Sequence, residues 1–440
     1  MAKQTFQTPP GMHDILPDEQ LLWERFRITA ASVAEFYGFA RIDTPILEFS
    51  DLFKKGTGEE TDIVAKEMFS LKTRGGDELT LRPEGTPPVV RAFLQHGMEK
   101  WSSPVKLYYD GPMFRHEKPQ RGRFRQLHQF GLEVIGEDDP VRDVQIIRAI
   151  TVILEKLKVS KFRLEINTIG CSECRPRFLR QFKDYYRGRL RGLCADCRER
   201  YKTNPMRILD CDDEKCQRVK IHAPQVIDNI CEKCHNHFQS VLELLDTLCV
   251  PYLLNPHLVR GLDYYTKTVF EIFEGDIDEG ATDENGKKRL AIASGGRYDN
   301  LVKLLGGRPT PAVGGAIGME RTLKIVSESV KDAKTSAGPA VSLIQVGMNA
   351  KKKTLCIMED FREAGIAVHE AFGRGSLTAQ LKAANKAEVY LTVIVGQQEV
   401  RDNVAIIREM DTGNQETIPQ EKLIQEIKKR LKKKAAHRTP

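Results

Sequence analysis

The chain has 440 residues, which is too long for one ordinary hydrophobic core and indicates roughly two to four domains. Hydrophobic residues make up 40% and charged residues 29%, which argues against disorder along the whole length, and no apolar stretch approaches the ~20 residues of a membrane span. The net charge of +7 permits an anionic partner but does not prove one.

The N-terminal part of the chain predicts an α+β fold around an antiparallel sheet. Apolar residues at helical spacing indicate a helix over 18–37. Alternating apolar and polar residues indicate two long strands, 105–115 and 124–135, joined by the polar loop 116–123. The other elements expected in chain order are a strand at 39–46, a helix starting near residue 86, a helix at 139–157, a strand at 162–166, a helix at 236–249, strands at 269–273 and 290–293 around the loop 274–289, and a helix at 318–330.

The C-terminal part predicts a small α/β unit with a largely parallel sheet, because strands and helices alternate there. Its expected strands are 343–347, 366–371 and 389–395, with helices near 351–364 and 376–386. Two sheet types on either side of a linker indicate two domains, with a third inserted in the first. The predicted boundaries are 1–170 and 241–330 for the first domain, 171–240 for a Cys-rich helical insert, 331–341 for the linker and 342–440 for the last domain.

Eight of the ten cysteines fall in the insert, in four closely spaced pairs. The N-terminus lacks the apolar run of a secretory signal, so we expect a cytoplasmic protein whose thiols are reduced and whose clustered cysteines bind metal. Four pairs can form two four-thiolate sites in three ways, and the sequence does not choose among them. It predicts one or two structural zinc sites from Cys171, Cys174, Cys194, Cys197, Cys211, Cys216, Cys231 and Cys234. The isolated Cys249 and Cys356 are expected in the core.

One face of the predicted hairpin carries polar side chains. The strand period of two places Gln129, Gly131 and Glu133 on one face, and Tyr109 and Arg115 share a face of the partner strand. Unpaired charges on a covered face cost several kcal/mol each, so plain core is disfavoured. A functional site and a solvated face with cross-strand ion pairs both remain open from the pattern alone.

Six motifs, in order and at compatible spacing, carry a family resemblance that covers essentially the whole chain. The run FRHEKPQRGRFRQLHQFGLEVIG at 114–136 resembles motif 2 of class II aminoacyl-tRNA synthetases and, more narrowly, that of the histidyl-tRNA synthetase family. The other five are PPGMHDILP at 9–17, GFARIDTPILE at 38–48 in the position of the dimer-forming motif 1, TLRPEGT at 80–86, LVRGLDYYTKTVFE at 258–271, which is similar to the histidine-specific signature, and GGAIGMERTL at 314–323, which is similar to motif 3.

The resemblance implies a class II catalytic domain, a C-terminal anticodon-binding domain and a homodimer. It implies ATP-dependent activation of L-histidine to histidyl-adenylate with Mg²⁺ on the phosphates, then transfer of histidine to tRNA(His). Arg115 and Arg260 would be the catalytic residues, and Arg115, Arg123 and Arg321 would bind ATP. Histidine would be bound by Glu84, Gly85, Thr86, Arg115, Gln129, Glu133, Arg260, Tyr264 and Tyr265, of which Glu133, Tyr264 and Tyr265 would contact the imidazole ring. The glycines of the run 293–299 would line the adenylate site with backbone. The acceptor end of tRNA would meet Gln120, Arg121 and Arg123. Zinc is not implied by the family.

Two other functions are weighed against this one. A catalytically silent regulatory subunit of ATP phosphoribosyltransferase shares the catalytic fold, but it should lack the anticodon-binding domain and parts of the histidine signature. A zinc-dependent RNA-binding module should bind RNA without pyrophosphate exchange. Because the chain keeps both the signature and the C-terminal unit, the sequence favours the synthetase.

Overall fold

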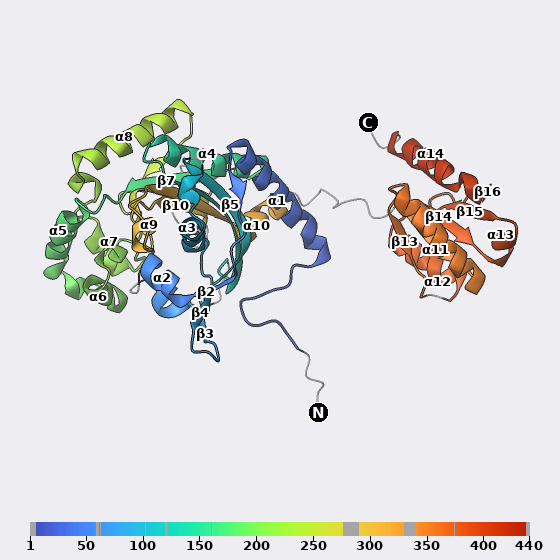
Figure 1. The fold of residues 1–440 in the computed structure, drawn as a ribbon, viewed down its shortest axis with the longest axis horizontal. Coiled ribbons are helices and arrows are strands. Elements are labelled where there is room, and N and C mark those ends of the chain that lie inside the picture. Colours follow the sequence, from blue (N-terminus) through green and yellow to red (C-terminus); the bar gives the residue numbers. More distant parts are fainter. Residues whose placement is uncertain are drawn as a thin grey trace. The chain divides into compact units, whose positions relative to one another are not determined.

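The structure, a computed structural model, describes residues 6–58, 61, 63–101, 103–118, 122–159, 161–275, 290–329, 340–373 and 375–436. Two compact units divide the chain, Met1–Lys331 and Asp332–Pro440, and each is described by itself (Figure 1). Within the described ranges, no helix is long and apolar enough to cross a membrane. The linker predicted at 331–341 and the loop predicted at 274–289 lie mostly outside these ranges.

A mixed sheet of eight strands forms the centre of the first unit. Neighbours run antiparallel from β5 to β7, and the short edge strands β1 and β8 pair in parallel. The antiparallel sheet predicted from the alternating runs is therefore confirmed. The strand order is β1 (Ala40–Arg41), β5 (Val105–Phe114), β6 (Gln126–Ile135), β11 (Ala312–Gly318), β10 (Ala291–Arg297), β9 (Thr266–Glu274), β7 (Phe162–Thr168) and β8 (Leu253–Leu254).

The strand predicted at 39–46 is wrong in its length. Only β1 joins the large sheet, and the chain then passes into β2 (Leu47–Phe49) of a separate small sheet. Pro45 lies between the two strands and cannot donate to a ladder. The carbonyl of Thr44 instead accepts a hydrogen bond from Arg82 at 2.9 Å, which fixes the crossing between the sheets.

Four helices cover one face of the large sheet and enclose a hydrophobic core. They are α1 (Pro17–Phe36), α4 (Val141–Lys156), α8 (Glu232–Thr247) and α10 (Met319–Ser329) (Figure 1). Apolar residues of these helices share one buried cluster with Phe130 of β6 and Phe270 of β9. The four helices predicted here from their apolar periodicity are confirmed, although α8 begins already at Glu232.

The opposite face of the sheet carries the polar side chains predicted to share a face. Tyr109 stands across from Gly131, and Leu107 across from Glu133. This face is covered by α3 (Thr86–Gln95) and α9 (Leu301–Leu304), whose apolar residues join Tyr109 in a second buried cluster. Nearby lie α2 (Ser50–Thr57), the turns Ile63–Glu67 and Met98–Lys100, and the small antiparallel sheet of β2, β4 (Glu78–Leu81) and β3 (Phe69–Lys72).

The Cys-rich insert between β7 and α8 is helical, as predicted. It consists of α5 (Arg175–Arg187), α6 (Ala195–Lys202), α7 (Glu214–Lys220) and the turns Leu190–Gly192, Pro205–Ile208 and Ile227–Asn229. Its buried residues Phe178, Phe182 and Tyr186 belong to the same cluster as Tyr109 and Tyr265. The insert therefore shares a core with the polar face of the sheet.

The second unit has a mixed sheet of five strands, where the sequence predicted a largely parallel one. The order is β13 (Val368–Glu370), β12 (Val341–Gln345), β14 (Leu391–Val395), β15 (Val404–Glu409) and β16 (Gln415–Pro419). β12 pairs in parallel with β13 and β14, whereas β15 and β16 form an unpredicted antiparallel hairpin. Its helices are α11 (Met348–Glu363), α12 (Leu377–Lys386), α13 (Gln397–Arg401) and α14 (Leu423–Ala436), with a short turn at Gln420–Lys422.

Candidate active site

Two adjoining cavities lie in the first unit, and Arg260, Ser294 and Ala316 line both of them. The larger cavity has a volume of about 190 Å³ and is rich in charged side chains. The smaller one has a volume of about 40 Å³ and is lined by tyrosines, glycines and one carboxylate, that of Glu84. The pair of cavities can therefore accept an anionic group in the larger space and a small polar group in the smaller one.

The structure brings the four predicted arginines together around the larger cavity. Arg115 donates from Nε to the carbonyl of Pro83 at 2.9 Å, and Arg321 donates to the carbonyls of Gly122 and Ala291 at 2.9 and 2.7 Å. These backbone bonds fix both guanidinium groups at the cavity wall. Burial and then the neighbouring charge of Arg115 lower the pKa of Arg321, so positive charge is crowded there. Such crowding favours a bound anion.

Arg123 also lines the larger cavity, with 43% of its side chain exposed, and pairs with Glu117 at 3.2 Å. It lies at the end of the loop that joins β5 and β6. The two other residues predicted to meet tRNA, Gln120 and Arg121, lie outside the described residues.

Arg260 stands where the two cavities meet. It donates from Nη1 to Glu271 and from Nη2 to Ser294 Oγ at 2.9 Å, and its guanidinium lies 5.4 Å from the ring centre of Tyr265. Burial alone would lower the pKa of Arg260, but the carboxylate of Glu271 and the rings of Tyr265 and Tyr264 together outweigh it and raise the pKa. The group therefore stays ionised, and its Nε is buried without a hydrogen-bond partner among the described residues.

Glu84 is the buried carboxylate of the smaller cavity. It accepts hydrogen bonds from Tyr264 Oη at 2.7 Å and from Thr57 Oγ1 at 2.8 Å. Burial raises the pKa of Glu84, and these two hydrogen bonds act against that rise. The carboxylate is thus held in place with the small cavity in front of it, beside Gly85, Thr86 and Gln129.

The ring of Tyr109 explains two of the glycines in the motifs. A Cβ at Gly85 would lie 2.2 Å from this ring, and one at Gly131 would lie 2.1 Å from it. Both positions therefore need glycine to let the tyrosine pass between the strand and the first turn of α3. By contrast, Gly295 and Gly296, which were expected to line the adenylate site, line neither cavity, and their strand contributes Ser294 instead.

Glu133 lies one layer behind the smaller cavity and does not line either one. It accepts hydrogen bonds from Tyr298 at 2.5 Å, Thr86 at 2.7 Å and Tyr109 at 3.4 Å, and a Cβ at Gly314 would lie 1.7 Å from its carboxylate. The carboxylate therefore fixes three lining side chains. Its predicted contact with the histidine ring stays a prediction.

The pKa of Glu133 predicts a pH-dependent contribution to stability. Burial raises this pKa from 4.5 to about 8, so between these values the folded state holds a proton that the unfolded state has released. The stabilising contribution is complete below pH 4.5 and is lost as the pH rises through 8. Over this range, urea unfolding should show the wild type losing free energy of unfolding relative to Glu133→Gln. An identical pH dependence of the two proteins would show that Glu133 titrates normally.

The structure brings the eight clustered cysteines into two groups. Cys171, Cys174, Cys231 and Cys234 form the first group, and Cys194, Cys197, Cys211 and Cys216 form the second, each with its sulfurs within 4.8 Å of one another. Each group can hold a metal ion. Sγ–Sγ distances within the groups, such as 3.7 Å for Cys171–Cys174 and 3.8 Å for Cys194–Cys211, match the edge of about 3.8 Å that a tetrahedron with Zn–S bonds of ~2.3 Å has.

The two isolated cysteines correct the sequence prediction. Cys249 and Cys356 are exposed, whereas both were expected in the core. Cys249 lies just after the end of α8 with a φ of 52°, in a turn at the surface, and Cys356 lies on α11. Isolation along the chain therefore did not indicate burial.

The sequence predictions missed several residues that bind Arg260 or line the smaller cavity. Glu271 and Ser294 face each other across β9 and β10, and Arg260 binds both. Tyr109 and Tyr298 complete the smaller cavity. Strand alternation placed Tyr109 on the correct face, but only the pairing of β9 with β10 brings Glu271 to Ser294.

The antiparallel sheet with an arginine-lined cavity beside a small polar pocket defines a class II aminoacyl-tRNA synthetase. A family model described as histidyl-tRNA synthetase matches residues 11–174 and 206–322, and one described as an anticodon binding domain matches residues 340–430. The chain belongs to the histidyl-tRNA synthetase family. The first match omits residues 175–205, which contain α5, α6 and two cysteines of the second group.

Curated relatives cover nearly the whole chain. The histidine--tRNA ligase of Dehalococcoides mccartyi (strain CBDB1) is 43% identical over 97% of this chain and 100% of its own length. That of Desulforamulus reducens is 41% identical over 96% of this chain and 99% of its own.

Solved structures of histidyl-tRNA synthetases have the same fold as this chain. The crystal structure of apo S. aureus histidyl-tRNA synthetase matches with a TM-score of 0.77 at 29% identity, covering 96% of this chain and 99% of that one. A Bacillus halodurans structure, described as an ATP phosphoribosyltransferase regulatory subunit/histidyl-tRNA synthetase, matches with a TM-score of 0.62 at 20% identity, covering 90% of this chain and 98% of that one. The second likeness shows a shared fold alone.

Proposed function

We infer that this protein activates L-histidine with ATP and transfers it to tRNA(His). The observation that carries this function is the meeting of the arginine-lined cavity and the small carboxylate pocket at Arg260, in a chain that matches histidine--tRNA ligases over 97% of its length. The anticodon-binding match at 340–430 favours the synthetase over the regulatory subunit, which was expected to lack that domain.

The chemistry of activation fits the charges of the larger cavity. A carboxylate oxygen of histidine attacks the α-phosphorus of ATP, and the bond to pyrophosphate breaks. Because no side chain needs to act as nucleophile, the protein's task is to position both substrates and neutralise charge. We assign the phosphates to Arg115, Arg123 and Arg321, since guanidinium groups stay ionised and bind oxygens bidentately.

Arg260 is placed to act on the reacting groups themselves, because it lines both cavities. We assign it to the α-phosphate and the carboxylate of histidine, together with Arg115. In the smaller cavity, Glu84 would receive the α-ammonium group, helped by Gln129 and the Gly85–Thr86 backbone. Tyr264 and Tyr265 would contact the imidazole. The ring of Tyr298, which donates to Glu133, lies 5.8 Å from that of Tyr264 between ring centres.

The carboxylates that line the larger cavity already have partners in the structure. Glu117 pairs with Arg123, Glu271 with Arg260, and Glu320 accepts from the backbone and ring of His128 at 2.8 Å. An all-protein cage for Mg²⁺ does not fit this arrangement. Mg²⁺, which the family implies, would be held mainly by phosphate oxygens and water, as is usual for nucleotide sites.

We propose that each cysteine group holds one structural zinc ion. Four thiolates fill a tetrahedral shell and leave no open position for chemistry, and the sulfur spacing described above fits zinc. We also propose that Gln120, Arg121 and Arg123 meet the acceptor end of tRNA(His). The cytoplasmic location stays a prediction.

A homodimer is proposed from the motif 1 segment. Ile46, Leu47 and Phe49 expose 43%, 39% and 61% of their surface beside each other, and such a cluster is costly when left in water. Analytical ultracentrifugation should give a mass twice that of the 49.9 kDa chain. A monomer at micromolar concentration would contradict the proposal.

Histidine-dependent ATP–pyrophosphate exchange tests the function. The wild type should exchange only when histidine is present. RNA binding without exchange would instead support the RNA-binding module and overturn the enzyme assignment.

A further inference from the structure

The first cysteine group adjoins the start of β9, directly after Tyr264 and Tyr265 of the smaller cavity. At the end of β7, Ile169 N donates to Lys267 O and Lys267 N donates to Gly170 O, both at 2.8 Å. Gly170 has a φ of 69°, and a Cβ there would lie 2.7 Å from Cys174 Sγ. Glycine at 170 therefore lets the chain turn sharply after β7. Cys171 follows only two residues after Ile169, which is hydrogen-bonded to Lys267.

Arg175 links this group to the histidine pocket. It directly follows Cys174 in the first turn of α5, and its backbone N donates to Cys171 O at 3.0 Å. Its side chain donates from Nη2 to the backbone carbonyl of Tyr265 and from Nε to the carbonyl of Ile169 at 3.5 Å. The guanidinium therefore ties the first turn after the cysteines to the backbone of a residue that lines the smaller cavity.

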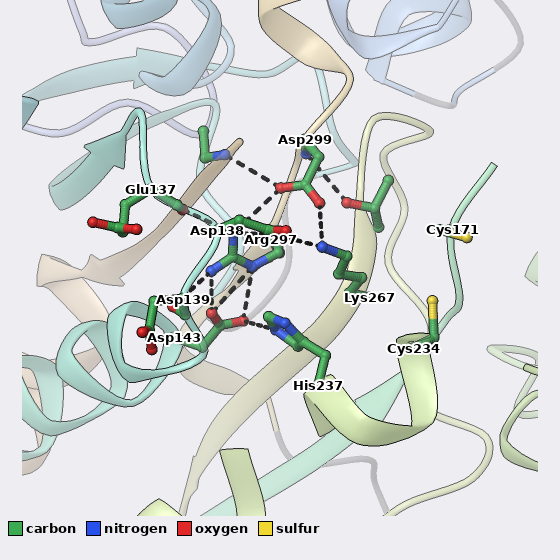
Figure 2. Close-up of polar contacts among 12 residues, drawn as sticks. Glu137, Asp138, Asp139, Asp143, Cys171, Cys234, His237, Lys267, Arg297 and Asp299 are labelled. Carbon is green, nitrogen blue, oxygen red and sulfur yellow. Dashed lines mark hydrogen bonds and ion pairs between the residues drawn. The ribbon is translucent and has the colours of Figure 1, made fainter. Parts of the chain in front are cut away.

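The other half of the first group is anchored through α8. Figure 2 shows His237, one turn along from Cys234, pointing to Asp143, which it contacts at 3.4 Å. Asp143 also accepts from Arg297 Nε at 3.1 Å, and both side chains of this ion pair are almost fully buried. Burial alone would raise the pKa of Asp143, but Arg297 and His237 together hold it at about 2. The Asp143–Arg297 pair therefore stays charged and joins α4 to the sheet, and His237 attaches α8 to this pair.

Lys267 belongs to the same anchored region. Its ammonium lies 2.5 Å from Asp138 and 3.1 Å from Asp299 (Figure 2). Both halves of the first cysteine group are therefore attached to the sheet, Cys171 and Cys174 through the end of β7 and Cys231 and Cys234 through α8. A metal ion bound by all four thiolates would join the start of α5, and with it Arg175, to α8.

We propose that Arg175 is a positioning residue for histidine, and that a metal ion in the first cysteine group holds it in place. Arg175 fixes the Tyr265 carbonyl and thereby the Tyr264–Tyr265 pair, of which Tyr264 donates to Glu84 and Tyr265 lies under Arg260. Arg175 itself lines neither cavity. The inference rests on the proposed histidine pocket and metal site.

Arg175→Ala should raise the KM for histidine about tenfold in pyrophosphate exchange, because a hydrogen bond from a charged donor is lost, and leave the KM for ATP within about twofold. Calorimetric titration with histidine alone should show the same loss of affinity. Arg177→Ala is the matched control, since Arg177 is exposed on the same helix, and it should behave as wild type. Arg175→Lys keeps the charge with one donor group and should fall between the two; it carries the test if Arg175→Ala does not fold.

Cys231→Ser tests the link to the metal site. Alone it should raise the KM for histidine, and in the Arg175→Ala background it should add little, because both changes act through one contact. Unchanged histidine affinity in Arg175→Ala, equal effects on histidine and ATP, or additive effects of the two changes would overturn the inference. A wild type without histidine-dependent exchange would instead overturn the proposed function itself.

Discussion

Arg260→Ala is expected to lower the kcat of histidine-dependent pyrophosphate exchange about 10²- to 10³-fold, the usual cost of removing one preorganised group that stabilises charge in the transition state. Arg260 is the ionised side chain that lines both cavities, so it can act on the phosphate and on the carboxylate of histidine at once. The KM for ATP should change much less, because Arg115 and Arg321 remain. The rate of pyrophosphate exchange at saturating histidine and ATP measures the effect on kcat.

The loss could also arise from Glu271, which Arg260→Ala would leave as a bare negative charge facing the phosphates. The double variant Arg260→Ala, Glu271→Gln separates the two causes because it removes that charge while keeping the shape of the side chain. We expect the double variant to stay as slow as Arg260→Ala. Recovery to near wild-type kcat would remove the catalytic role from Arg260 and leave it as the partner of Glu271.

Removal of metal from the two cysteine groups should have the largest effect on stability. Structural zinc contributes about 10–16 kcal/mol of apparent free energy in small zinc domains at pH 7, which exceeds the stability of most folded domains. Because the insert shares its core with the polar face of the sheet, chelation should expose 171–234 to proteases and also weaken histidine binding. Limited proteolysis with and without chelator measures this.

The two cysteine groups predict how many zinc ions and how many reactive thiols each chain has. Native protein should carry two zinc ions per chain and show two reactive thiols, Cys249 and Cys356, which are exposed outside both groups. Cys249→Ser should therefore leave the zinc content unchanged. Less than a few tenths of an equivalent of zinc, with all ten cysteines reactive in the folded protein, would contradict the two zinc sites.

Short-range pattern predicted the parts of the molecule that depend on neighbours in the sequence. The period of two placed Gln129 and Glu133 on the face that holds the site, and the hairpin followed from the alternation of its two runs. The β15–β16 hairpin was missed although the run Asp411-Thr412-Gly413 between its strands is a turn signal.

Contacts between distant segments could not be predicted in the same way. Cys171 meets Cys231 because the start of α8 lies next to the end of β7. The spacing of cysteines along the chain does not predict this contact. Glu271 meets Ser294 only through strand pairing, and the position of Glu133 behind Gly314 depends on the neighbouring strand β11. Family resemblance named the site residues, whereas the layer in which each one lies came from the structure.

Charging of tRNA(His) with labelled histidine tests the central claim most directly. Folded, metal-loaded protein should attach histidine to tRNA(His) only when ATP is present, and the yield should fall in parallel with pyrophosphate exchange in Arg260→Ala. A folded wild type that leaves tRNA(His) uncharged, or that charges it equally well without ATP, would contradict the assignment.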